Sequence, residues 1–120
     1  MKVGGRGSAV VAFNAVNGSP ITFAGFLSPQ SGRRRRQLRE LLERGEGLVL
    51  FEGPHRILKL LGDLQELAPA RPCLLAREMT KIHEEFLRGT ASELAESAKT
   101  MSAKGELTVL VEGNVRQSSK

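Results

Sequence analysis

The chain has 120 residues, of which 40% are hydrophobic, 26% charged and 4% aromatic, with a formal net charge of +5 and one cysteine, Cys73. This length suits one domain with one core, and a single cysteine excludes an internal disulfide and a cysteine zinc site. No apolar run reaches the roughly 20 residues of a membrane span and no secretory leader is recognisable, so we expect a cytoplasmic protein without a membrane partner.

The first half of the chain alternates between helical and extended patterns. Residues 8–16 are small, apolar and compatible with a helix, and residues 21–27 have the pattern of a strand. A helix is expected over residues 33–44, because leucines recur there at helical spacing until Gly45 ends it. Four consecutive apolar residues at 48–51 predict a buried strand.

The next segments continue this alternation. Gly53-Pro54 opens a predicted helix. Its inner face is expected to comprise Ile57, Leu58, Leu61, Leu64 and Leu67. Residues 73–76 then form a short apolar strand, which places Cys73 in the core, and residues 85–88 fit a further strand.

Thr90 and Glu93 have the spacing of a capping box, which predicts a helix that starts there and runs to about Ala98. Residues 107–111 form the last predicted strand. Strands that alternate with helices predict a single α/β domain, with a mixed sheet of about five strands and about four helices. The core is expected to consist of Leu, Val, Ala and five Phe, because the chain contains no Trp or Tyr.

Ionisable residues follow two of the predicted strands directly. The strand at 48–51 is followed by Glu52, His55 and Arg56. The strand at 73–76 is followed by Arg77, Glu78, Thr80 and Lys81. Ligands of open α/β sheets bind beyond the carboxyl ends of the strands. If the two strands are parallel neighbours, we expect Arg77 or Lys81 to lie within direct or water-bridged reach of Glu52 or Glu78.

Simpler interpretations of these residues remain open. Arg77-Glu78 could be an ordinary surface pair, and His55 could belong to the first turn of its helix. His83-Glu84-Glu85 lacks the two-histidine spacing of a zinc protease helix, so no metal site is predicted.

A run of four arginines, Arg33, Arg34, Arg35 and Arg36, begins the helix predicted over residues 33–44. Positive charges near a helix N-terminus oppose its dipole, at a cost of about 0.3 to 1 kcal/mol each. An anionic partner such as RNA would remove that cost, whereas a solvated helix face is the alternative. The low aromatic content argues against a protein that binds single strands by stacking bases on aromatic rings.

Four stretches resemble, in order and spacing, the C-terminal half of the 16S rRNA-methylating branch of the tetrapyrrole methylase-like family. They are FAGFLSPQSGRRRRQLRELL, LVLFEGPHRILKLLGDL, LLAREMTKIHEEFLRGTASEL and KGELTVLVEG. The resemblance covers about residues 8–114, which leaves residues 1–7 as a divergent start and residues 115–120 as a polar tail. The Pro-Gly-Pro-Ser-Ala segment of the family appears here as Gly5-Arg6-Gly7-Ser8-Ala9.

The resemblance implies S-adenosylmethionine-dependent methyl transfer to the ribose 2′-hydroxyl of a cytidine in 16S rRNA, with the small ribosomal subunit as partner. The implied catalytic residues are Glu52, Arg56, Arg77, Glu78, Lys81 and Glu84, with His55 and His83 behind them. The carboxylates are candidate bases, while the cations would hold phosphate or polarise the acceptor. Implied cofactor-binding residues are Ser8, Glu52 and Glu106, and the implied RNA-binding residues are Arg33 to Arg36.

The family also carries an N-terminal domain that supplies much of the cofactor pocket and has no counterpart here. We therefore expect a fragment with an incomplete S-adenosylmethionine site that is inactive alone, with a separate N-terminal half-enzyme as a possible partner. The alternatives are a stand-alone RNA-binding module and a dimerisation domain, and a homodimer is expected from the family.

Overall fold

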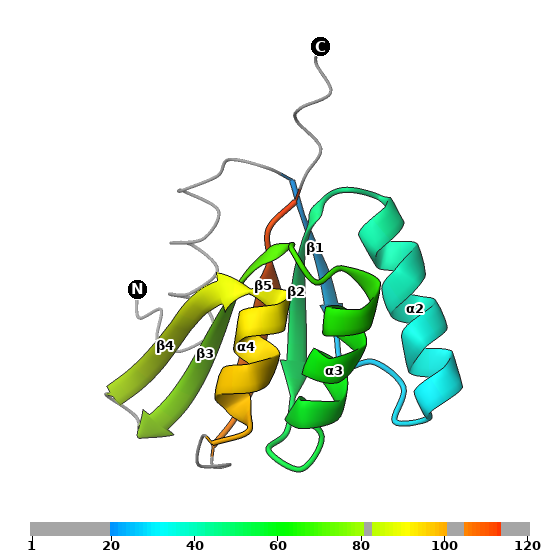
Figure 1. Cartoon of the computed structure of the whole chain (residues 1–120). Helices are drawn as coiled ribbons and strands as arrows, with labels where there is room; N and C mark the ends of the chain where they lie inside the picture. Colours follow the sequence, from blue (N-terminus) through cyan, green and yellow to red (C-terminus); the bar gives the residue numbers. More distant parts are fainter. Residues whose placement is uncertain (1–19, 81–82, 101–104, 114–120) are drawn as a thin grey trace.

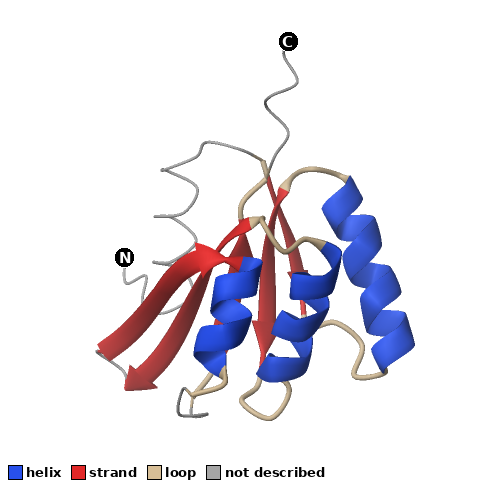
Figure 2. Ribbon diagram, in the orientation of Figure 1, coloured by secondary structure: helices blue, strands red, loops and turns tan. Residues whose placement is uncertain are grey.

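The computed structural model describes residues 20–80, 83–100 and 105–113, in which three helices lie on one face of a five-stranded sheet (Figures 1 and 2). The strands are β1 (Ile21–Gly25), β2 (Gly47–Glu52), β3 (Pro72–Thr80), β4 (His83–Thr90) and β5 (Leu107–Val111). The helices are α2 (Ser31–Glu43), α3 (Ile57–Leu67) and α4 (Ala91–Ala98). The predicted α/β class and mixed five-stranded sheet are confirmed. The fourth expected helix, at residues 8–16, lies outside the described residues.

The strand order is β1-β2-β5-β3-β4, and it bears on the condition that the strands before Glu52 and Arg77 are parallel neighbours. β1 and β2 are parallel, whereas β5 is antiparallel to both β2 and β3. β2 and β3 therefore run in the same direction, but they are not neighbours, because β5 lies between them (Figure 1). Their carboxyl ends still lie at the same edge of the sheet.

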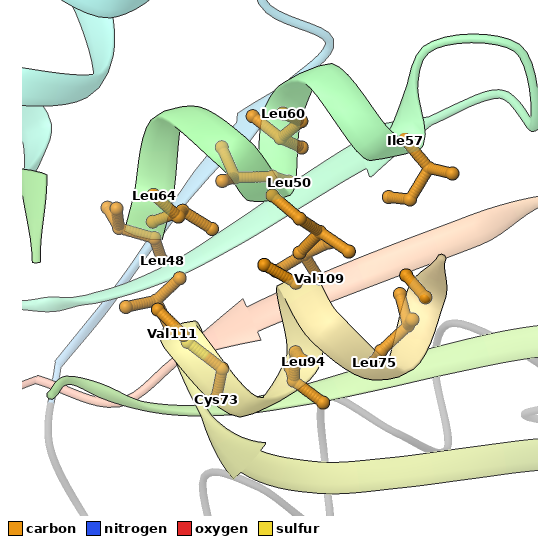
Figure 3. Close-up of a cluster of buried hydrophobic side chains, with 14 of the residues drawn as sticks. Leu48, Leu50, Ile57, Leu60, Leu64, Cys73, Leu75, Leu94, Val109 and Val111 are labelled. Carbon is orange, nitrogen blue, oxygen red and sulfur yellow. The ribbon is translucent and has the colours of Figure 1, made fainter. Parts of the chain in front are cut away.

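The main core lies between the sheet and the helices. Leu48 and Leu50 of β2, Leu75 of β3 and Val109 of β5 pack there with side chains of α3 and α4 (Figure 3). Intervening strand residues such as Val49 form a smaller buried cluster, because successive side chains of a strand point to opposite faces. Burial on both faces explains why these strands are continuous apolar runs rather than alternating ones.

Helix α3 buries a different set of side chains from the predicted one. Leu58 is 49% exposed, whereas Leu60 and Asp63 are buried. The helix begins only at Ile57, because the chain makes a turn after Gly53 in which the Arg56 N–H donates to the Gly53 carbonyl at 3.1 Å. No helix among the described residues is both long enough and apolar enough to span a membrane.

The helix boundaries that rest on local motifs are confirmed. The Glu93 N–H donates to Thr90 Oγ1 at 3.1 Å, and the Thr90 N–H donates to Glu93 Oε1 at 2.8 Å, which completes the predicted capping box of α4. Gly45 ends α2 in the left-handed region, with φ of 78°, and its N–H donates to the Leu42 carbonyl. Only glycine adopts that conformation without strain.

Three of the four phenylalanines in the described residues contradict the expectation that they belong to the core, while Phe13 lies outside those residues. Phe23, Phe26 and Phe86 are 63%, 62% and 48% exposed, and Phe51 is only partly buried. The buried side chains of the described core are instead chiefly Leu, Val and Ala. Phe23 and Phe26 therefore leave exposed aromatic surface on β1 and directly after it.

Candidate functional site at the carboxyl edge of the sheet

Glu52 and Arg77 lie in one row at the edge of the sheet where β2 and β3 end. Both are register partners of Leu107, the first residue of β5, one on each side of it. Cross-strand partners project from the same face of a sheet, and Leu107 belongs to the core on the helix-covered face. The residues Glu52 and Arg77 are only 4% and 6% exposed. The edge thus places two opposite charges, largely withdrawn from water, on either side of one leucine.

The row continues onto β4, where Glu85 is the register partner of Arg77. Arg77 Nη2 forms an ion pair with Glu85 Oε1, which adds Glu85 to the residues of this edge. Glu52 Oε1 accepts a hydrogen bond from the Gly53 N–H at 2.9 Å. Sequence reasoning did not include Glu85 among the site residues, because only the β3–β4 register brings it opposite Arg77.

Strand β3 is longer than predicted, and this changes the setting of several candidates. Its pairing with β5 ends at Arg77, while its pairing with β4 continues to Thr80. Arg77, Glu78 and Thr80 are therefore strand residues, and Glu78 is the backbone register partner of Glu84. Their hairpin extends the sheet edge beyond the row that contains Arg77.

The remaining predicted residues lie around this edge or outside the described part. His55 and Arg56 are exposed in the connection from β2 to α3, and exposed Glu106 directly precedes β5. Ser8 and Lys81 lie outside the described residues. The structure thus gathers Glu52, Arg56, Arg77 and Glu106 at one edge of the sheet.

The arginine run is divided by the packing of α2 on α3. Arg34 is 3% exposed, and its Nε donates to Asp63 Oδ2 at 2.6 Å. Arg35 Nη1 lies 3.2 Å from Asp63 Oδ1 and also pairs with Glu66, which is the main cause of a raised pKa of the Arg35 guanidinium. Arg33 and Arg36 are exposed. We therefore remove Arg34 from the predicted RNA contact, because its guanidinium is enclosed between the helices.

The sequence contained a signal for this division that our prediction did not use. Arg34 precedes Leu38 and Leu42 at steps of four residues, and these three are the buried residues of α2. Residues at such spacing share one helix face. Asp63 lies on the buried face of α3 in the same way, between Leu60 and Leu64. A charge on each of two apolar faces indicates a buried ion pair.

Comparison with known proteins shows what the chain resembles. Residues 8–95 match the family model of the Tetrapyrrole (Corrin/Porphyrin) Methylases. Ribosomal RNA small subunit methyltransferase I of Coprothermobacter proteolyticus is 48% identical over 92 residues, which cover 77% of this chain and 40% of that protein. The Thermotoga maritima protein of the same name is 40% identical over 106 residues, which cover 88% of this chain and 47% of that protein. The chain spans less than half the length of these relatives.

Solved structures of methyltransferases share the fold of this chain. The cobalamin biosynthetic enzyme cobalt precorrin-4 methyltransferase superimposes with a TM-score of 0.60 at 15% identity, over 87% of this chain and 48% of that one. Uroporphyrin-III C-methyl transferase from Thermus thermophilus, solved with S-adenosylhomocysteine, gives a TM-score of 0.51 at 22% identity. The match covers 90% of this chain and 60% of that one. At these identities the likeness concerns the fold alone.

Proposed function

The chain belongs to the tetrapyrrole (corrin/porphyrin) methylase family, and from this premise we propose that it forms part of an S-adenosylmethionine-dependent methyltransferase acting on small-subunit rRNA. The observation that carries the proposal is the 48% identity over 92 residues to a protein named for that activity. Because the chain spans less than half of such relatives, we further propose that it is inactive alone and needs the remaining part, on the same chain or a separate one.

The acceptor that we propose is the ribose 2′-hydroxyl of a cytidine in 16S rRNA. A hydroxyl becomes a good nucleophile only as its proton leaves, so a base within hydrogen-bond reach accelerates the transfer. Glu52 is our first candidate, because its carboxylate is buried at the shared edge and one of its oxygens is fixed by the Gly53 N–H. Glu78 and Glu84 are the alternative bases, since they are register partners on the adjoining hairpin.

The cofactor that we propose would supply the methyl group. Its ribose hydroxyls and positive sulfonium favour carboxylate neighbours, and the described edge offers Glu52 and Glu106. Ser8 is a further proposed contact from the family resemblance. These residues fit part of such a cofactor, which agrees with a pocket that the rest of the relatives' length completes. Arg77 is assigned a positioning role, because its ion pair with Glu85 joins β3 to β4 beside the site.

The RNA contact that we propose comprises exposed Arg33 and Arg36 near the start of α2, and exposed Arg56 after β2. α2 starts at the edge where β1 ends, so these cations and the carboxylates share one end of the molecule (Figure 1). Exposed guanidinium groups are well suited to phosphate oxygens, which they bind in a bidentate manner.

Methyl transfer tests the proposal directly. The isolated chain and a fusion that restores the rest of the Thermotoga maritima relative are each given radiolabelled S-adenosylmethionine and undermethylated small subunits. We expect transfer by the fusion only. Comparable turnover by the isolated chain would show that the missing part is dispensable, while an inactive but folded fusion that does not bind the subunit would overturn the assignment.

RNA affinity at a series of salt concentrations tests the arginine contact. Arg36→Gln is expected to weaken binding and to reduce the salt slope by about 0.7 for a single strand or about 0.9 for a duplex. Lys99→Gln removes the same charge directly after α4, where the ammonium pairs with Glu96, and is the matched control. Equal effects of the two substitutions would mean that net charge, rather than α2, governs binding.

A further inference from the structure

Phe26 is held in an exposed position by its local backbone. The pairing of β1 with β2 is irregular between Phe23 and Gly25, and Gly25 has a φ of 66°. A Cβ at Gly25 would meet no atom within 4 Å, so glycine is required there by the backbone rather than by space. The turn leaves Phe26 62% exposed, immediately after the strand ends.

A second aromatic ring supports Phe26. The rings of Phe26 and Phe51 meet edge to face, with centroids 5.8 Å apart and an interplanar angle of 65°. Such pairs are favourable beyond the area that they bury. Phe26 is therefore a positioned ring with most of its surface open to solvent, which suits it for contact with another flat group.

A cleft of about 280 Å³ lies between β1 and α2, with Phe26 in its wall. Phe23 and Phe26 line the strand side, while Gln37, Glu40 and Arg44 are among the residues of the helix side. The Gln37 carboxamide oxygen accepts from the Ser28 N–H at 2.9 Å, which orients that side chain. The cleft thus combines aromatic surface with an amide, a carboxylate and a guanidinium, which is the chemistry that recognises a base edge and its phosphate.

The charges along α2 favour a polyanion as occupant. Arg34 and Arg35 form ion pairs with acidic residues of α3. The exposed charged residues of α2 and its C-cap are then four arginines, Arg33, Arg36, Arg39 and Arg44, and two acids, Glu40 and Glu43. The centre of a protein interface is depleted in charged residues, whereas sites for single-stranded RNA combine aromatic rings with cations.

We propose that the cleft between β1 and α2 binds an unstacked base of single-stranded RNA, with Phe26 as the stacking surface and the α2 arginines on the adjoining phosphates. This inference rests on the proposed rRNA function and adds a single-strand contact to it. It also departs from the expectation, drawn from the low aromatic content, that the protein does not stack bases on aromatic rings, because Phe26 is one of the few rings and is exposed.

The test compares Phe26→Leu, Phe26→Tyr and Phe86→Leu for binding to a labelled single-stranded RNA and to its duplex. Phe26→Leu is expected to weaken single-strand binding roughly 5- to 100-fold without changing the salt slope, since base stacking is uncharged. Phe26→Tyr keeps the ring and should retain affinity. Phe86→Leu removes an exposed ring from β4, at the opposite edge of the sheet from β1, and should leave binding unchanged. Duplex binding should be insensitive to all three.

The outcomes separate this inference from the proposed function. If Phe26→Leu leaves single-strand affinity unchanged while Arg36→Gln still lowers the salt slope, the stacking site is overturned and the RNA-binding proposal stands. If neither substitution alters binding, the stacking site at Phe26 and the arginine contact of α2 are both overturned. A Phe26→Leu variant with altered oligomeric state and unchanged RNA affinity would show that the cleft contacts protein instead.

Discussion

Arg34 of α2 and Asp63 of α3 form an ion pair that is almost completely enclosed: Nε lies 2.6 Å from Oδ2, and the two side chains are 4% and 9% exposed. Arg34 Nη1 also donates to the Pro29 carbonyl at 3.2 Å, which ties the loop before α2 to the same pair. The pair orients α2, and it thereby determines that Arg33 and Arg36 rather than Arg34 face solvent.

Asp63→Asn is expected to lower the free energy of unfolding by about 3 to 5 kcal/mol, because it leaves the Arg34 charge buried without its counter-ion. Urea denaturation measures the change. Glu66→Gln is the matched control, since the Glu66 side chain is 62% exposed and should leave stability nearly unchanged. Equal losses in the two variants would contradict the enclosed pair. A practical consequence is that RNA contacts are best tested in Arg33 or Arg36, because removing all four arginines would also destabilise the domain by leaving Asp63 without Arg34.

Gly89→Ala is expected to destabilise the protein through the capping box of α4. A Cβ at Gly89 would lie 2.7 Å from Glu93 Oε1, so the alanine would displace the carboxylate that accepts from the Thr90 N–H. Thr90→Ala removes the other half of the box and should cost about 0.5 to 2 kcal/mol.

A double-mutant cycle, followed by thermal denaturation, checks this origin. In a Glu93→Ala background, which has no carboxylate to displace, Gly89→Ala should cost much less than in the wild type. Additive effects of the two substitutions would instead locate the need for Gly89 in the β4 backbone.

Cys73 is expected to make stability depend on alkaline pH. Burial raises the pKa of its thiol to about 12 from an ordinary value of 9.0, because the thiolate loses hydration in the core. A group whose pKa is higher in the folded state contributes stability that is fully present below its unfolded pKa. The contribution is therefore intact below about pH 9 and is lost as the pH rises from 9 toward 12.

Urea denaturation of wild type and Cys73→Ala at pH values on both sides of 9 provides the measurement. The difference in unfolding free energy between the two proteins should shrink as the pH rises, because only the wild type has a thiol to ionise. A difference that stays constant across that range would show that the thiol is hydrated in the folded protein.

Glu52→Gln, introduced into the full-length fusion, is expected to reduce methyl transfer by roughly 10²- to 10⁴-fold, the usual contribution of a general base. The amide keeps an oxygen that can accept from the Gly53 N–H, so folding and RNA binding should be retained. Glu43→Gln, on the exposed surface of α2, is the control. If Glu78→Gln abolishes transfer and Glu52→Gln does not, the base is Glu78.

Features that depend on neighbours along the chain could be predicted from the sequence. The capping residues Thr90 and Glu93 and the helix end at Gly45 were predictable, because each is a local hydrogen-bonding or backbone requirement. The apolar runs that became β2 and β5 were predictable for a similar reason, since a short continuous run suits only a strand buried on both faces. These patterns sufficed for the fold class and for the position of Glu52 at a strand end.

Which side chains meet could be learned only from the tertiary structure. The insertion of β5 between β2 and β3 places Leu107 between Glu52 and Arg77, and strand order is set by long-range pairing that leaves no mark on local periodicity. The ion pair of Arg77 with Glu85 depends on the hairpin register in the same way. The exposure of Phe26 could not be predicted from composition, because an apolar side chain is buried only where another element covers it, and Phe26 directly follows the left-handed turn at Gly25 that ends β1.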